Sequence, residues 1–141
     1  MKILVAVDGS NFTKKALDYI AQHRTMFVDG HELIVAHVCS AVPPHVTRHL
    51  AKEVVDDYYA EEGAKVIDPI KAQLAERGIT NYTIDLRHGH AAEEILRSAK
   101  AAGAELVVMG THGHGLFGRA LMGSVATKVI AESDITVMLV Q

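Results

Sequence analysis

The sequence predicts one α/β domain, in which a parallel, doubly wound sheet of five strands carries helices on both faces. Short apolar runs recur at wide spacing, and segments with helical periodicity separate them. Strands that alternate with helices require right-handed crossovers, which make the sheet parallel. The length of 141 residues suffices for one sizeable core but not for two ordinary domains, so residues 1–141 are expected to form a single unit.

Five apolar runs are the expected strands, at residues 3–7, 32–38, 82–86, 106–109 and 135–140. Three of them are almost continuously apolar and rich in Val, Ile and Leu, as in strands buried on both faces of a parallel sheet. The run at 82–86 instead alternates, with Tyr82, Ile84 and Leu86 on one side. This alternation predicts an edge strand with one wetter face.

Helical segments fill the first two gaps between these strands. Ser10 can cap a first helix, which is expected to end near Met26. A second helix is expected from about residue 47 to residue 77, and it should stop at Gly78. Because proline removes a helical hydrogen bond, Pro69 predicts a kink or break near Asp68.

Two further helices complete the alternation. The segment 91–102 is expected to end at Gly103. The last helix is expected to begin near Ser124 and to bury Val125, Val129 and Ile130.

Composition and charge exclude several classes of protein. The 14 Lys and Arg residues against 17 Asp and Glu residues leave a net charge of −3, the wrong sign for coating nucleic acid. The single cysteine, Cys39, excludes an internal disulfide and a thiolate-rich zinc site, and it favours a reducing cytoplasm. No apolar run approaches about 18 residues, and the N-terminus lacks a signal-peptide cleavage site, so a cytoplasmic protein without a membrane span is expected.

A glycine-rich segment at residues 110–124 carries the strongest functional signal. Five of the eleven glycines lie there, directly after an expected strand and before an expected helix. Ligands of open α/β sheets bind beyond the carboxyl ends of the strands, where the winding reverses. Glycines admit a ligand close to backbone amides, and a helix N-terminus attracts anions, so this segment predicts a phosphate site.

Two common nucleotide motifs fit this segment poorly. Gly113-x-Gly115-x-x-Gly118 satisfies the dinucleotide fingerprint, but it follows the fourth strand rather than the first. Gly113 and Gly118 also match part of a phosphate-loop motif. However, Arg119 and Ala120 stand where that motif requires Lys and Ser or Thr, so its phosphoryl-transfer chemistry is not supported.

A third pattern, Gly110-x2-Gly113-x9-Gly123-Ser124, fits without exception. With it, and with the opening run 3–10, the whole chain resembles the nucleotide-binding branch of the universal stress protein family. The resemblance implies a Rossmann-like sheet of the adenine nucleotide alpha hydrolase type. It also implies an ATP site, with Mg²⁺ or Mn²⁺ held mainly by the phosphates rather than by protein ligands.

The resemblance assigns parts of the nucleotide to this chain residue by residue. It implies that Asp8 and the backbone around Val7 and Val38 hold the adenine and ribose end, and that Met109 and Gly110 line the ribose. Glycines and the start of the last helix would wrap the phosphates. The complete expected ATP-binding set is Ala6, Val7, Asp8, Val38, Met109, Gly110, His112, Gly113, Arg119, Gly123, Ser124 and Val125.

Chemical reasoning leaves alternatives open at several of these positions. Asp8 can accept from an amine or hydroxyl, or it can cap the first helix. Ser124 can donate to a phosphate or cap the last helix, and these two roles are compatible. Arg119 is either a charged fork for a terminal phosphate or a solvated loop residue. His112 or His114, near a phosphate, is expected to act as a donor that strengthens when protonated.

Other reactive side chains give no strong functional signal. His88 and His90, like His112 and His114, flank a glycine, but neither pair has a carboxylate at ligand spacing, which argues against a dedicated metal site. Cys39 is expected to be a buried or pocket-lining thiol. The acidic residues Glu53, Asp56, Asp57, Glu61 and Glu62 have the spacing of a solvated helix face.

The C-terminal strand is the expected contact with a second copy. Val137, Met138, Leu139 and Val140 form a short apolar edge that would aggregate if left bare, which favours a homodimer. Universal stress proteins commonly carry a proline just before this strand, and Ser133-Asp134-Ile135 stands there instead.

The function expected from the glycine-rich segment and the family resemblance is an ATP-binding, nucleotide-responsive stress module with an unknown downstream partner. A slow ATP hydrolase, in which Asp8 or a histidine positions water, and an interaction module that binds no nucleotide are the alternatives.

Overall fold

The structure is a computed structural model that describes residues 1–112 and 122–141. Its five strands form one sheet in the order β3-β2-β1-β4-β5, and every neighbouring pair is parallel. The strands are β1 (Lys2–Ala6), β2 (Glu32–Ser40), β3 (Tyr82–Gly89), β4 (Leu106–Gly110) and β5 (Thr136–Val140). The predicted fold class is confirmed, and β3 lies at an edge of the sheet as its alternating sequence predicted.

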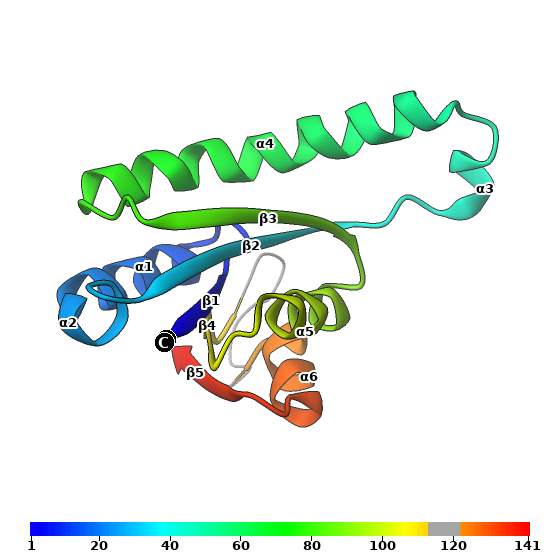
Figure 1. Cartoon of the computed structure of the whole chain (residues 1–141). Coiled ribbons are helices and arrows are strands. Elements are labelled where there is room, and N and C mark those ends of the chain that lie inside the picture. Colours follow the sequence, from blue (N-terminus) through cyan, green and yellow to red (C-terminus); the bar gives the residue numbers. More distant parts are fainter. Residues whose placement is uncertain (113–121) are drawn as a thin grey trace.

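Helices cover both faces of the sheet (Figure 1). They are α1 (Asn11–Gln22), α2 (Arg24–Phe27), α3 (Pro44–Thr47), α4 (Lys52–Glu76), α5 (Ala91–Ala102) and α6 (Ser124–Glu132). One core forms where α1 and α4 pack on the sheet, and it contains Val5, Leu17 and Ile70. The second core lies between the opposite face and the pair α5 and α6, around Leu4 and Ala99. The side chains of Ile3 to Ala6 in the central strand β1 are all apolar, because they point alternately into the two cores.

The winding of the sheet reverses between β1 and β4. From β1 the chain adds β2 and β3 on one side, and it then returns to add β4 and β5 on the other. The crossover connections on the two sides of this point leave a crevice beyond the carboxyl ends of β1 and β4. The topology therefore places a potential ligand site between the loop after β1 and the loop after β4.

The first helical segment is shorter than predicted. Instead of running to Met26, α1 ends at Gln22, and α2 follows as a separate turn. The backbone of His23 leaves the helical region, with φ −120° and ψ 52°, and its Nδ1 lies 2.9 Å from the carbonyl oxygen of Tyr19. A histidine ring that also packs on Tyr19 stabilises this interruption.

The second helical segment also differs from the prediction. Residues 44–47 form the separate α3, with Pro44 in its first turn, so α4 begins only at Lys52. The helix α4 is not broken at Pro69. Ile67 and Ile70 on either side are buried in the core, and their packing holds the helix together across the lost hydrogen bond.

The last two helices follow the prediction except that Val125, expected to be buried, is only partly buried, and Ile130 is exposed. α5 ends before Gly103, whose φ of 70° is the left-handed conformation that favours glycine. α6 begins at Ser124, and it buries Ala126 and Val129. Ile130 was expected to be buried but lies 43% exposed, because its position on the helix faces away from α5 and the sheet. No helix in the described part of the chain is long and apolar enough to cross a membrane.

Candidate functional site

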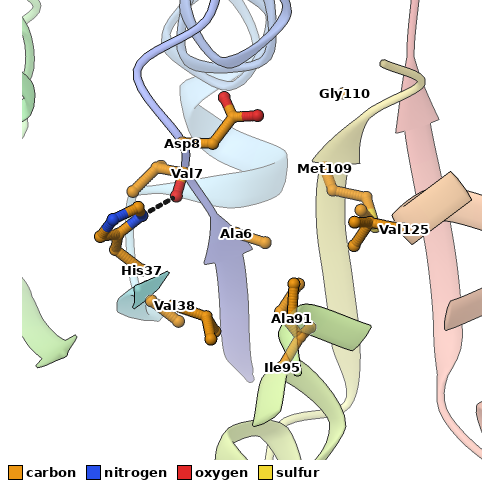
Figure 2. A pocket seen from close by; sticks show the side chains of 11 residues that line it. Ala6, Val7, Asp8, His37, Val38, Ala91, Ile95, Met109, Gly110 and Val125 are labelled. Atoms are coloured by element: carbon orange, nitrogen blue, oxygen red, sulfur yellow. Dashed lines mark hydrogen bonds between the residues drawn. The ribbon is translucent and has the colours of Figure 1, made fainter. Parts of the chain in front are cut away.

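A cleft of about 420 Å³, open to solvent, lies at the carboxyl ends of β1, β2 and β4 (Figure 2). It occupies the point where the winding of the sheet reverses, as expected for a ligand site of this fold. Seven residues of the predicted ATP-binding set line it: Ala6, Val7, Asp8, Val38, Met109, Gly110 and Val125. Its remaining lining comes from Ala36, His37, Ala91 and Ile95.

Small side chains create the hollow. Ala6 on β1, Ala36 on β2 and Ala91 at the start of α5 all face it, and none extends beyond Cβ. Longer side chains, from Ile95 and Met109, then form apolar walls. An apolar slot with few polar groups at its rim suits a flat aromatic ligand, which loses water-exposed surface when it enters.

Asp8 is held in one orientation by the start of α1. Its Oδ1 accepts hydrogen bonds from the Ser10 amide at 2.9 Å and from the Thr13 hydroxyl at 2.8 Å. The Thr13 oxygen in turn accepts from the Asp8 amide at 3.0 Å. Ser10, and not Asp8, caps α1, since its hydroxyl accepts from the Thr13 amide at 3.3 Å. The alternative that Asp8 serves as the helix cap is therefore wrong, although Asp8 does shape the turn into the helix.

His37 lines the cleft and was missed by the sequence analysis. Its ring Nδ1 donates to the Val7 carbonyl at 2.8 Å, a bond that joins the ends of β1 and β2 (Figure 2). The ring is buried, and the Val7 amide is bound to the Ala36 carbonyl at 2.9 Å. The role of His37 could be found only from the pairing of β1 with β2, because the register that places Ala6 beside Ala36 brings His37 next to Val7.

Gly110 permits close packing beneath the cleft. A Cβ atom at this position would lie 2.6 Å from the Cβ of Phe12 and 3.1 Å from its carbonyl carbon. The first turn of α1 therefore approaches the end of β4 more closely than any residue other than glycine at position 110 would allow. The sequence analysis explained this glycine by ligand approach, and the structure adds a packing reason.

A second hollow adjoins the cleft at the N-terminus of α6. It shares Met109, Gly110 and Val125 with the cleft and adds three more predicted residues, His112, Gly123 and Ser124. The Gly123 amide donates to the Thr111 carbonyl at 2.6 Å, which brings the two ends of the glycine-rich segment together. Predicted residues Gly113 and Arg119 lie outside the described residues.

The start of α6 offers backbone amides to this hollow. Gly123 is its N-cap residue, and no side-chain hydrogen bond caps the helix within the described chain. The alternative role of Ser124 as the cap is therefore wrong, because Ser124 is the first residue inside the helix and its side chain is exposed. Uncapped first-turn amides with the positive end of a helix dipole favour an anion at this place.

The ring of His112 faces the first turn of α1. It packs against Phe12 with ring centroids 4.8 Å apart, and its Nδ1 lies 2.8 Å from the Thr111 hydroxyl. These contacts hold the imidazole at the hollow beside the N-terminus of α6. The position suits a donor to an anion at α6.

The other described histidines and Cys39 lie at separate places in the fold. β2 and β1 separate β3 from β4, so the pair at His88 and His90 lies apart from His112. Within residues 1–112 and 122–141 no three His, Cys, Asp or Glu side chains could share a metal ion. Cys39 is buried as predicted, and burial, followed by the charge of Glu62, raises the pKa of its thiol.

Fold and cleft together define a doubly wound α/β protein with a candidate ligand site at its switch point. The family model described as "Universal stress protein family" matches residues 1–141, and this chain belongs to that family. Universal stress protein YxiE of Bacillus subtilis is 32% identical over 147 residues, which cover 99% of this chain and 98% of that protein. The solved structure of hypothetical protein MJ0577 aligns with a TM-score of 0.78 at 27% identity, over 99% of this chain and 94% of that chain.

Solved proteins of the same fold include complexes with adenine nucleotides. A universal stress protein from Archaeoglobus fulgidus in complex with dAMP aligns with a TM-score of 0.66 at 22% identity, over 100% of this chain and 98% of that chain. A universal stress protein in complex with cAMP (TM-score 0.68, 20% identity) covers 100% of this chain and 96% of its own. An Arabidopsis thaliana family member with AMP bound (TM-score 0.65, 16% identity) covers 99% and 90%. At these identities the likeness to this chain concerns the fold.

Proposed function

We propose that this chain is a cytoplasmic regulatory module of the stress response that binds ATP in the cleft between β1 and β4. The observation that carries the proposal is an apolar slot at the switch point that continues into a hollow at the N-terminus of α6, where no described side chain caps the helix. A nucleotide has the same two parts, a flat apolar base and an anionic tail. The complexes of other family members with dAMP, cAMP and AMP support an adenine base.

The side chains suggest how the nucleotide lies. Adenine would enter between Val38 and Met109, with the backbone of Val7 within reach of its polar edge. The Asp8 carboxylate would accept from a ribose hydroxyl. The phosphates would then lie against the amides of α6 and near His112. Mg²⁺ or Mn²⁺ would neutralise the phosphate charge, held mainly by phosphate oxygens.

The proposal also includes a homodimer through the C-terminal strand. β5 is an edge strand of the sheet, and Val137, Met138, Leu139 and Val140 are all partly exposed in one copy of the chain. An apolar edge with unpaired backbone groups is a template for pairing with a second β5. These features support the assembly that the sequence predicted.

Nucleotide extraction is the direct experiment. Acid extraction of the purified protein is expected to release an adenine nucleotide, and millimolar ATP with Mg²⁺ is expected to raise the Tm of the emptied protein. The variant Ala91→Phe fills the slot and should abolish both effects. Ala101→Phe, at the exposed far end of the same helix, is the matched control and should leave them intact. Absence of nucleotide and of any thermal shift would overturn the proposal.

The same preparation distinguishes a regulatory module from a slow ATP hydrolase. ATP turnover is followed with Mg²⁺ and then with Mn²⁺, with the variant Gly123→Val as the background. Turnover by the natural chain well above that background would favour the enzyme. Binding without such turnover supports the regulatory module.

A further inference from the structure

The first part of α4 lies outside the hydrophobic core. Of the residues in this helix, Gly63 is the first to be buried, so residues 52–62 contribute no buried side chain. Figure 1 shows α3 and the first turns of α4 beyond the carboxyl end of β2. Helices in water are usually stabilised by a covered apolar face, and this segment has apolar side chains without such a cover.

An apolar groove lies between this part of α4 and the α3 region. It is lined by Val42, Val46, Thr47, Leu50, Val54, Val55 and Tyr58. The side chains of Val46, Leu50, Val54 and Tyr58 are 44%, 46%, 52% and 46% exposed, respectively. These are four of the nine large hydrophobic residues that are exposed in the described chain. Such clustering on one surface indicates a binding site rather than scattered surface residues.

The groove has a strongly acidic border along α4. Five carboxylates lie within residues 53–62, at Glu53, Asp56, Asp57, Glu61 and Glu62, and all except the half-buried Glu62 are exposed. Lys52 is the one lysine or arginine in the eleven residues of α4 that precede Gly63. Glu62, together with Glu61, also raises the pKa of Lys65 in the next turn, through a hydrogen bond and charge. An apolar strip beside a row of carboxylates complements a partner that is apolar on one side and basic beside it.

We propose that the groove formed by residues 42–58 docks a basic amphipathic helix of a partner protein. Helix-in-groove binding buries apolar anchors at positions i, i+3, i+4 and i+7, and Lys or Arg beside these anchors would meet the α4 carboxylates. An extended strand fits less well, because α3 and α4 form their hydrogen bonds internally and present no sheet edge here. The carboxylates also repel anionic membranes and nucleic acids.

The groove lies near the nucleotide cleft without being part of it. Tyr58 lines both the groove and a neighbouring cavity, whose other lining includes His37. His37 also lines the cleft. A helix docked in the groove would therefore lie one cavity away from the proposed ATP site. The docking itself does not depend on nucleotide, so the inference goes beyond the proposed function.

The test uses the full chain and a synthetic amphipathic helix with leucine at the anchor positions and lysine elsewhere. Binding is measured by fluorescence anisotropy of the labelled peptide, and the site is mapped by amide chemical shifts. Changes centred on residues 42–58 are expected. The variants Leu50→Asn and Val54→Asn should each weaken binding by at least about tenfold. The control Met26→Asn, which alters a 58% exposed side chain on α2, should leave affinity within roughly twofold.

The remaining tests change the charge of the groove or of the peptide and measure whether the chain associates with itself. Added salt and the double variant Asp57→Asn with Glu61→Gln should both weaken binding, and a peptide with glutamate in place of lysine should not bind. Equal losses in the Met26→Asn control, or equal affinity for the acidic peptide, would overturn the proposal. Self-association of the chain that Leu50→Asn abolishes would also overturn it, because the occupant would then be a second copy. ATP binding measured on the same variants keeps this result separate from the proposed function.

Discussion

Thr13 determines how Asp8 faces the cleft. Its hydroxyl donates to the Asp8 carboxylate and accepts from the Asp8 amide, so one buried side chain satisfies two groups of the same residue. A carboxylate held in this way enters binding already oriented, which lowers the entropy lost when a ligand hydroxyl reaches it. Thr13 is therefore a positioning residue for the proposed nucleotide site.

The variant Thr13→Val is expected to weaken ATP binding by about tenfold, which corresponds to the loss of roughly one hydrogen bond. Thr13→Ser keeps the hydroxyl and should restore the affinity. Calorimetric titration with ATP measures both variants. In an Asp8→Asn background, Thr13→Val should cause a smaller further loss of ATP affinity, because the two residues act as one unit. Full additivity of the two losses would show that Thr13 acts independently of Asp8.

Gly110 offers a second test at the residue scale. Gly110→Ala is expected to destabilise the fold by about 1–3 kcal/mol, because the new Cβ would meet the Cβ and backbone of Phe12. Gly63→Ala is the matched control, since the three atoms nearest to its Cβ belong to the exposed side chain of Leu86, which can turn aside more easily than backbone. Urea unfolding should show a clearly smaller loss for Gly63→Ala. Equal losses would mean that backbone crowding is not the cause.

At the scale of elements, a polar cluster joins the edge strand β3 to α5. Asp85 on β3 accepts a short hydrogen bond from the buried Ser98 on α5 and another, at 2.9 Å, from Arg87. Burial raises the pKa of Asp85, but the Ser98 hydrogen bond and the adjacent Arg87 outweigh burial, so the pKa lies below its ordinary value. Because the carboxylate is favoured in the folded state, ionised Asp85 contributes to stability.

The contribution of Asp85 should depend on pH in a defined direction. Because the pKa of Asp85 is lower in the folded state, its carboxylate stabilises the fold fully at pH values above about 4, the ordinary pKa of aspartate. This stabilisation is lost as the pH falls through the pKa of the folded state. Ser98→Ala should cost about 1 kcal/mol at neutral pH. The difference in unfolding free energy between the natural chain and this variant should narrow at acidic pH. Urea titrations at both pH values measure it, and a constant difference would contradict the role of Asp85.

At the scale of the whole molecule, the two edges of the sheet differ in what they expose. β3 follows the long helix α4 and mixes half-buried with exposed residues, whereas β5 has four successive partly exposed apolar residues. Edge strands with an apolar surface need a partner or a charged guard, and β5 contains no charged residue. This contrast favours β5 over β3 as the surface of the proposed homodimer.

If the proposed dimer forms through β5, Met138→Lys, which places a charge in the middle of this strand, is expected to leave the chain monomeric. Ile130→Lys on α6 is the control, since Ile130 is exposed near the same end of the chain but outside the strand. Analytical ultracentrifugation gives the mass of each variant, and circular dichroism confirms that the fold is retained. A monomeric natural chain, or a dimer that survives Met138→Lys, would exclude this interface.

The local pattern of the sequence determined the class of fold and most of the cleft. Apolar runs and helical periods predicted five strands in a doubly wound sheet, and glycines at Gly103 and Gly110 marked the ends of α5 and β4. Ten of the twelve predicted site residues lie around two adjoining hollows, and Gly113 and Arg119 lie outside the described residues. These features were predictable because strand ends and helix starts are local properties, and parallel winding brings them to one edge.

Only the tertiary structure decided the contacts between distant segments. The pairing of β1 with β2 placed His37 beside Val7, and the approach of α1 to β4 gave Gly110 its packing role. The core kept α4 continuous through Pro69, and the same fold left the first turns of that helix uncovered. Local propensity carries no information about which side chain meets which across the sheet. Contacts between distant side chains depend on strand register, on helix placement and on the burial that these produce, all of which exist only once the chain has folded.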